Sequence, residues 1–321
     1  MASILCEVSA ATLAVRLWPR QTSSPPARAN LHRESPPTMD VHLLLVPYDS
    51  AQRGLRLGAG PERLVEHGLP RALEQGGHRV RTTTVDPPTD GWRAEIGTAF
   101  QLASALAGHV RDARESGAFP LVLAGNCMAT LGVVAGLGPR TGVLWFDAHA
   151  DFNTPETTIG GFLDGMALAT ITGRCWSAMT EQVPGFHPVP DADVWLLGAR
   201  DLDSLEAHAL ARSGVRRLGA DAIGRDLADR VRHEPPGPAQ MHVHLDLDVL
   251  DPRDGRANMY AAPNGVRAGA LVAACHSVGA TVRPVALTVS AYDPSFDPGG
   301  TVARIAIEAT MALVNSLASR S

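Results

Sequence analysis

Two short acidic motifs hold the residues whose types and spacing best suit chemistry. Residues 147–151 read D-A-H-A-D, and residues 246–248 read D-L-D. If each motif continues the period of a strand, its polar side chains share one face at the strand's end. The groups that would converge there are Asp147, His149, Asp151, Asp246 and Asp248. Carboxylates and an imidazole in such numbers are the ligands of divalent cations.

This donor set predicts a site for two metal ions. Asp and His ligands suit hard to borderline ions such as Mn²⁺. Two ions close together would hold a shared water and lower its pKa, which generates hydroxide near neutral pH. Taken singly, residues 147–151 could be a polar loop that caps a helix, and residues 246–248 a solvated turn before Asp251-Pro252. Both motifs together, each after an apolar run, favour the metal site.

The elements that must position these motifs alternate between two kinds. Short apolar runs predict strands, and between them lie helical patterns. This alternation predicts an α/β fold with one domain, a doubly wound, mostly parallel sheet and helices on both faces. In such sheets ligands bind beyond the carboxyl ends of the strands, where polar clusters follow three of the runs. The strands are expected at 41–48, 78–85, 119–124, 141–146, 193–198, 241–247 and 284–290, and the helices at 63–75, 94–116, 204–213, 268–276 and 301–318.

The first 38 residues differ from the rest of the chain. Residues 21–38 are rich in Pro, Ser and Arg, a composition that cannot bury enough surface to fold. Met39 then opens a clean strand pattern. We therefore expect a disordered extension at 1–38, even an artefact of start-codon choice, and a folded domain at 39–321. An amphipathic, Arg-rich targeting helix is not convincing in this stretch.

Composition excludes several classes of protein. The net charge of −5 argues against a nucleic-acid-binding surface. No apolar run approaches the roughly 20 residues that cross a bilayer. The four cysteines show neither CxxC spacing nor a compact framework, which indicates a reduced, cytoplasmic protein.

The two motifs also resemble those of a known family. Residues 147–155, DAHADFNTP, resemble the DAHxDxNTP segment of arginases and agmatinases, and residues 246–252, DLDVLDP, are similar to their DxDxxDP motif. Gly58, Gly60 and Pro61 look like the family's early glycine-rich loop, so the resemblance runs from Met39 to the C-terminus. It implies a three-layer α/β/α fold, two Mn²⁺ ions and hydrolysis of a guanidine or amidine carbon–nitrogen bond. It also implies a homo-oligomer.

The resemblance assigns roles to the metal ligands. It implies that Asp147 and Asp246 bridge the two ions. Asp151 would bind one of them, and His149 with Asp248 would bind the other.

The family's remaining ligand is a histidine in a GGDHS-like segment, which here reads A-G-N-C-M, with Cys127 at the histidine position. As a thiolate, Cys127 would ligate, weaken the preference for Mn²⁺ and raise the tolerance of Zn²⁺ or Fe²⁺. As a thiol, it would be a small buried hydrophobe. Bacterial relatives that act on hydroxylated arginine look similar here and share an NTPETT stretch like residues 153–158.

The substrate residues are also carried over by resemblance. Asn153 matches a position that contacts the substrate carboxylate, whereas a serine with the same role is Gly160 here. The family's RDxD segment places Asp203 opposite an α-ammonium, with Glu206 beside it. These two acids could instead cap the helix that follows, because acidic residues favour that position.

Two departures bear on catalysis. Asp164 stands where arginases have a histidine that shuttles protons, and an aspartate there is anionic unless its pKa is raised. Ala291 stands where a glutamate anchors the guanidinium, so a charge-assisted hydrogen bond is lost. The substrate would then be a modified guanidine or a formimino compound, unless Tyr292 or Asp164 replaces the anchor. His244 shares a strand face with Asp246 and is either a partner of the ligands or a core histidine.

The resulting expectation is an enzyme, a hydrolase of carbon–nitrogen bonds in linear amidines. Metal-bound hydroxide, hydrogen-bonded to Asp151, would attack arginine or N-hydroxyarginine, with Asp164 a candidate proton shuttle. The alternatives are a catalytically impaired metal-binding family member with a regulatory role, and a hydrolase of a formimino substrate. A small guanidino molecule is the expected partner. The sequence determines neither the substrate, the native metal nor the oligomeric state.

Overall fold

A parallel sheet forms the centre of the computed structural model, which describes residues 38–88, 94–233 and 240–318. Its eight strands lie in the order β4-β1-β5-β10-β9-β6-β7-β8, and every neighbouring pair is parallel. The strands are β1 Asp40–Val46, β4 Arg79–Thr84, β5 Phe119–Ala124, β6 Thr141–Phe146, β7 Val194–Leu197, β8 Arg216–Leu218, β9 Gln240–Asp246 and β10 Ala286–Ser290. A short antiparallel pair, β2 Tyr48–Asp49 and β3 Gln52–Arg53, lies outside this sheet.

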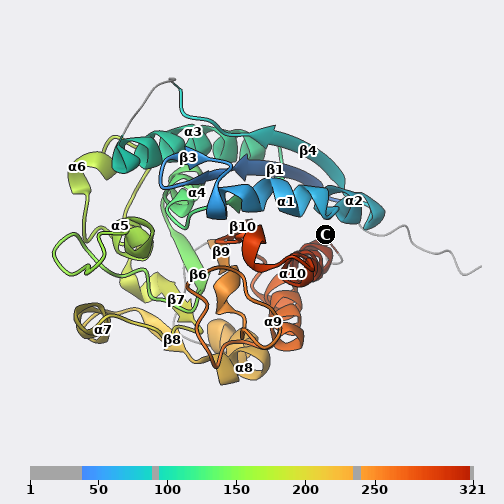
Figure 1. Cartoon of the computed structure of the whole chain (residues 1–321). Helices are drawn as coiled ribbons and strands as arrows, with labels where there is room; N and C mark the ends of the chain where they lie inside the picture. Colours follow the sequence, from blue (N-terminus) through green and yellow to red (C-terminus); the bar gives the residue numbers. More distant parts are fainter. Residues whose placement is uncertain (1–37, 89–93, 234–239, 319–321) are drawn as a thin grey trace, which may run out of the picture. The chain divides into compact units, whose positions relative to one another are not determined.

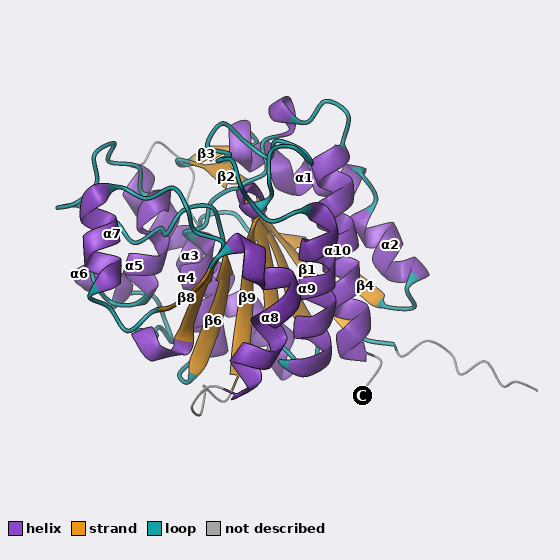
Figure 2. Cartoon of the chain, turned by 90° about the horizontal axis from the view of Figure 1, so that it is seen from below, coloured by secondary structure: helices purple, strands orange, loops and turns teal. Residues whose placement is uncertain are grey.

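Helices cover both faces of the sheet (Figure 1, Figure 2). One face packs against α1 Gly60–Glu66, α2 Leu69–Gln75, α8 Ala220–His233, α9 Ala268–Thr281 and α10 Thr301–Ala318. The other packs against α3 Glu95–Glu115, α4 Ala129–Leu137, α5 Ala167–Ile171, α6 Ser177–Thr180 and α7 Ser204–Ala211. The predicted three-layer α/β/α architecture is confirmed.

Burial explains why the strands read as continuous apolar runs. Every residue of β5 and of β6 is buried, since helices cover both faces. The pattern therefore placed β5 and β6 at their observed bounds. It missed β8, which has only three residues, and α4, which is apolar on every side and so lacks helical periodicity. The helix expected at 63–75 is two helices, because Gly68 adopts a left-handed φ of +96° before Pro70.

The strand order brings together the segments that carry chemistry. The strands β5, β10, β9 and β6 are adjacent at the middle of the sheet. Because the sheet is parallel, their carboxyl ends share one edge, and the residues that follow them meet there. Figure 2 shows two of these strands, β6 and β9, running in the same direction within the sheet.

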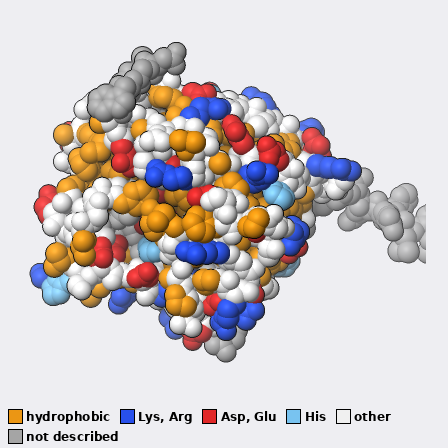
Figure 3. Space-filling view, viewed as in Figure 1, with side chains coloured by type: hydrophobic (Ala, Val, Ile, Leu, Met, Phe, Trp, Pro, Cys, Tyr) orange, Lys and Arg blue, Asp and Glu red, His pale blue; other side chains and the backbone are white. Residues whose placement is uncertain are grey.

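The expected disordered extension at 1–38 lies outside the described residues, apart from Thr38, and stays a prediction. Among the described residues one helix, α10, has the length and mean hydropathy of a membrane-spanning segment, and 61% of it is buried. It packs against α9 and α2 as part of the core. On the face drawn in Figure 3, acidic and basic side chains are interspersed rather than gathered into a basic stripe.

The glycine-rich segment at 58–60 allows close contact between its backbone and the segments that follow β5 and β10. A Cβ on Gly60 would lie 2.3 Å from the carbonyl oxygen of Tyr292, and one on Gly125 would lie 2.2 Å from that of Tyr48 and 2.9 Å from the Cα of Gly58. No side chain fits at these contacts. These glycines thus hold the segment before Cys127 against the early loop.

Gly60→Ala should therefore lower stability, by roughly 1–3 kcal/mol, because a backbone carbonyl must move. The matched control is Gly97→Ala in α3, where a Cβ meets nothing within 4 Å. That change should raise stability by about 0.5–1 kcal/mol, as alanine favours a helix. Urea unfolding of both variants measures the difference, and equal effects would contradict the close-approach argument.

Candidate metal centre

The predicted ligands lie around the carboxyl ends of β5, β6 and β9. Cys127 follows β5, Asp147 follows β6, and Asp246 is the last residue of β9. The expected strand alternation does not continue through the motifs. β6 ends at Phe146 and Asp151 has a left-handed φ of +49°, while Asp248 lies in the 3₁₀ helix η4 Leu247–Val249. Turns, not strand period, make the side chains converge.

Side chain to backbone hydrogen bonds shape these turns. Asp147 Oδ1 accepts from the N–H of His149 at 2.7 Å, and Asp246 Oδ1 accepts from the N–H of Asp248 at 2.8 Å. Asp248 Oδ1 in turn accepts from the N–H of Ala148 at 3.2 Å. Aspartate readily closes such turns onto backbone two residues on. The two motifs are thus tied to each other as well as to themselves.

Donor atoms gather in two overlapping groups. Asp147, His149 and Asp248 form the first, with Nδ1 of His149 3.3 Å from Asp147 Oδ1 and 3.4 Å from Asp248 Oδ2. The second adds Cys127, His244 and Asp246 around the same Asp147. Within each group one donor atom from every residue lies within 4.8 Å of the others. Asp147 belongs to both groups, and its expected role as a bridge between two ions stays a prediction.

Asp151 belongs to neither group, although it lines the same pocket and is buried. Its place as a ligand therefore stays a prediction. His244, which the sequence left open between a core and a partner role, does join the ligand donors.

The electrostatics of the centre favour a bound cation. Burial and neighbouring carboxylates raise the pKa of Asp246 and Asp151 well above the ordinary range and raise that of Asp147 too. Burial alone would lower the pKa of His149, but Asp248 and Asp147 raise it strongly. Burial would raise the pKa of Asp248, but His149 lowers it overall. Divalent ions would offset this crowding of negative charge, so the residues fit the metals that the motifs imply.

Two side chains that the sequence reading did not single out orient the ligands. The Trp145 indole Nε1–H donates to Asp147 Oδ2 at 2.9 Å. Asn258, fully buried, donates from Nδ2 to Asp248 Oδ2 at 3.2 Å and to the Ala291 carbonyl at 2.8 Å. Trp145 lies two residues before Asp147, and this strand spacing could have indicated that the two side chains share a face. No sequence pattern around Asn258 indicates its contact with Asp248.

A pocket of about 260 Å³ opens onto the centre. Candidate metal-binding side chains and the expected substrate residues line this pocket together. Ala291 also lines it, so no carboxylate is present at the position where a guanidinium anchor was expected. The lining residues that carry chemistry are Cys127, His149, Asp151, Asn153, Asp164, Asp201, Asp203, Glu206, Asp246, Asp248, Asn258 and Tyr260.

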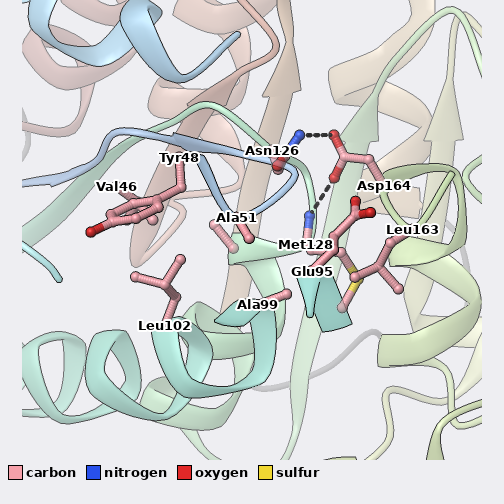
Figure 4. A pocket seen from close by; sticks show the side chains of 11 residues that line it. Val46, Tyr48, Ala51, Glu95, Ala99, Leu102, Asn126, Met128, Leu163 and Asp164 are labelled. Atoms are coloured by element: carbon pink, nitrogen blue, oxygen red, sulfur yellow. Dashed lines mark hydrogen bonds between the residues drawn. The ribbon is translucent and has the colours of Figure 1, made fainter. Parts of the chain in front are cut away.

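Asp164 lines both this pocket and a smaller one of about 30 Å³, which is drawn in Figure 4. The two carboxylate oxygens of Asp164 accept hydrogen bonds from the Asn126 side chain and the Met128 backbone N–H, both at 2.9 Å. Burial raises the pKa of Asp164 to about 7, although these donors act against the rise. The aspartate thus closes the turn before α4 and still titrates near neutral pH.

The expected substrate residues form one hydrogen-bonded set. Asn153 Nδ2 donates to Asp203 Oδ2 at 3.1 Å. Glu206 accepts from the backbone N–H groups of Phe152 at 2.8 Å and of Asp203 at 3.1 Å. Asp203 and Glu206 also form the capping box of α7. The capping interpretation is therefore confirmed, and both oxygens of Glu206 are already used by backbone.

The crowded acids predict how pH acts on the metal-free protein. The folded form keeps protons on Asp246 and Asp151 that the unfolded chain releases above about pH 4, and on His149 above about pH 6.5. The free energy of unfolding should therefore fall as pH rises from about 5 to 8, by roughly 1.4 kcal/mol per pH unit for each proton retained.

Urea unfolding of chelator-treated protein across this range measures the slope. Mn²⁺ should flatten it, because ions replace the retained protons, and Asp246→Asn should reduce it without metal. A metal-free protein whose stability does not change with pH would contradict this account of the centre.

Comparison with known proteins agrees with the geometry. The model of the arginase family matches residues 39–315. An arginase from Bacillus subtilis is 33% identical over 233 residues, 67% of this chain and 77% of that protein. An N(omega)-hydroxy-L-arginine amidinohydrolase from Streptomyces lavendulae is 31% identical over 181 residues, 55% of this chain and 62% of that protein.

The fold leads to the same family. The crystal structure of an arginase from Bacillus cereus superposes with a TM-score of 0.77 at 25% identity, covering 86% of this chain and 98% of that one. With the family match over most of the chain, the conclusion is direct: this protein belongs to the arginase family, whose members are hydrolases that act on carbon–nitrogen bonds in linear amidines.

Proposed function

We propose that this protein is a binuclear-metal amidinohydrolase that cleaves a guanidine carbon–nitrogen bond of arginine or N-hydroxyarginine. One observation carries the proposal. A single pocket is lined both by metal-type donors and by Asn153 and Asp203, which suit the amino-acid end of a substrate. The relative from Streptomyces lavendulae, named for hydroxyarginine, supports the same substrate class.

The metal ligands of the proposal are the six residues that the sequence motifs indicate, five of which belong to the two donor groups. When bound, two divalent ions would supply Lewis-acid chemistry and a lowered pKa for water. Mn²⁺ is the proposed native ion, on the family membership and the predominance of carboxylate donors. The residues are Cys127, Asp147, His149, Asp151, Asp246 and Asp248.

Asp203 and Asn153 are proposed to hold the substrate's α-amino-acid group. Asp203 presents a carboxylate to an ammonium, and its hydrogen bond from Asn153 fixes its orientation. Glu206 acts behind them. Its oxygens bind the Phe152 and Asp203 N–H groups, so it positions both neighbours and adds negative charge to the wall.

Asp151 and Asp164 are the proposed proton-transfer residues. Both line the pocket, and both are buried. In the proposal, Asp151 would accept a proton from the attacking water. Asp164, with a pKa of about 7, is suited to give a proton to the leaving amine, because a general acid works best near the operating pH.

The wider setting is also proposed. In the described part of the chain the cysteines Cys127, Cys175 and Cys275 are free, which suits a reducing cytoplasm. Self-association is proposed from the family resemblance, and a small guanidino molecule is the proposed partner.

The decisive assay measures urea and hydroxyurea release from a panel of guanidines by the Mn²⁺-loaded protein. The panel holds arginine, N-hydroxyarginine, agmatine, guanidinobutyrate and guanidinopropionate. A formimino amino acid is added because Ala291 stands where a guanidinium-anchoring carboxylate was expected; its hydrolysis releases formamide, which is measured separately. Metal-dependent release from one of the two α-amino acids is expected. Asp147→Asn serves as the blank.

Formamide release from the formimino compound alone would replace the proposed substrate and keep the hydrolase. Silence across the panel, with two ions bound, would contradict the proposed activity and favour a binding role.

Asp203→Asn should raise KM for the α-amino-acid substrate by about tenfold or more, because a charge-assisted hydrogen bond to the ammonium is weakened. kcat should change little if the contact is equal in the ground and transition states. Glu206→Gln is the contrasting variant. It should lower stability by roughly 1 kcal/mol through the α7 cap and leave KM within a few-fold. If Glu206→Gln instead raised KM and Asp203→Asn did not, Glu206 rather than Asp203 would be the residue that binds the ammonium.

A further inference from the structure

His244 faces the half of the metal centre that holds Cys127. It lies on β9 two residues before Asp246, fully buried, and its ring stacks on Trp145 with centroids 3.8 Å apart. Ser290 Oγ lies 3.3 Å from His244 Nε2 and 3.3 Å from Cys127 Sγ. The Nε2 edge of the ring is therefore turned toward Cys127.

The other ring nitrogen has the partner that a metal-binding histidine needs. His244 Nδ1 lies 2.7 Å from Thr130 Oγ1 on α4. When Nδ1–H donates to this hydroxyl, the lone pair of Nε2 is left free on the Cys127 side. Ligating histidines in proteins commonly have their second nitrogen held in this way.

The distances within the group suit a single small ion. Donor atoms of Cys127, Asp147, His244 and Asp246 lie within 4.8 Å of one another, and Cys127 Sγ is 3.0 Å from Asp246 Oδ2. Tetrahedral bonds of about 2.0–2.3 Å separate ligand atoms by roughly 3.5 Å. Only small side-chain movements are then needed to enclose an ion.

From this geometry we propose that His244 is a metal ligand, and that with Cys127 it makes this half of the centre a thiolate–imidazole site selective for Zn²⁺ or Fe²⁺ over Mn²⁺. The inference rests on the proposed binuclear centre, adds a ligand to it and replaces Mn²⁺ as the preferred ion in this half alone. The half around His149 and Asp248 has carboxylate and imidazole donors without sulfur and keeps the preference for Mn²⁺.

Trp145 explains how the chain can hold such a ligand in place. Its ring supports the face of His244 while its Nε1–H binds Asp147 Oδ2. One indole therefore fixes two members of the group. His242, the other buried histidine of β9, has different contacts. Its ring nitrogens lie near the Ala286 carbonyl and Thr288 Oγ1.

The test is titration of the metal-free protein with Co²⁺, followed by metal analysis and absorption spectroscopy. Wild type should bind two ions per chain, and one should show the near-ultraviolet thiolate-to-cobalt band. Cys127→Ser should abolish that band. His244→Gln should weaken the same ion by about 100-fold or more and leave the other within a few-fold.

His242→Gln is the matched control, since it removes a buried imidazole from the same strand. It should keep both ions and the band. Equal behaviour of the two glutamine variants would overturn the ligand role of His244, while two bound ions without a thiolate band in wild type would overturn that of Cys127. A wild type that binds no metal would instead contradict the proposed function.

For variants that do not fold, ¹⁵N-histidine NMR of the wild type gives a second measurement. Zn²⁺ should shift the His244 Nε2 resonance strongly and leave Nδ1 protonated, with His242 unchanged. In mixed metals, Zn²⁺ should displace one of two Mn²⁺ ions. Unmoved His244 resonances with two bound Zn²⁺ would contradict the inference.

Discussion

The repulsion among buried acids at the centre of the sheet edge is the constraint on which the structure around the site depends. Asp147, Asp246 and Asp248 are almost fully buried within one small region, with Asp151 close by in the pocket wall. Unpaired charges in such surroundings are costly unless cations or hydrogen bonds compensate them. Backbone N–H groups compensate part of this charge, and the donor geometry leaves the rest to divalent ions.

The surrounding elements hold these acids where repulsion would otherwise spread them apart. The ligand-bearing turns begin at the ends of fully buried strands, whose helices prevent the strands from shifting. Trp145 and Asn258 restrain Asp147 and Asp248 from the side. Close backbone contact at Gly125 keeps the Cys127 turn next to them. These contacts hold the donor groups near one another without an ion, which would reduce the cost of assembling a metal site.

The acids of the pocket wall hold the fold together as well as lining the site. Ala291 contributes its carbonyl to Asn258 and no side-chain anchor to a guanidinium. Asp164 combines a structural role at the start of α4 with a pKa near neutral, and Glu206 combines capping of α7 with charge beside Asp203. Several acids of the pocket therefore serve the fold and the site together. Their replacement changes stability as well as binding, so paired variants are needed to separate the two effects.

The sequence by itself determined the family, the three-layer fold and most of the donor types, because long apolar runs and two dense acidic motifs depend only on local order. It could not determine how the donors meet. Asp147 and His149 converge through a hydrogen-bonded turn, and His244 joins Cys127 only because β9, β10 and β5 are neighbours in the sheet. Asn258 has no local pattern at all. Such contacts join residues far apart in the chain, and only tertiary packing decides them.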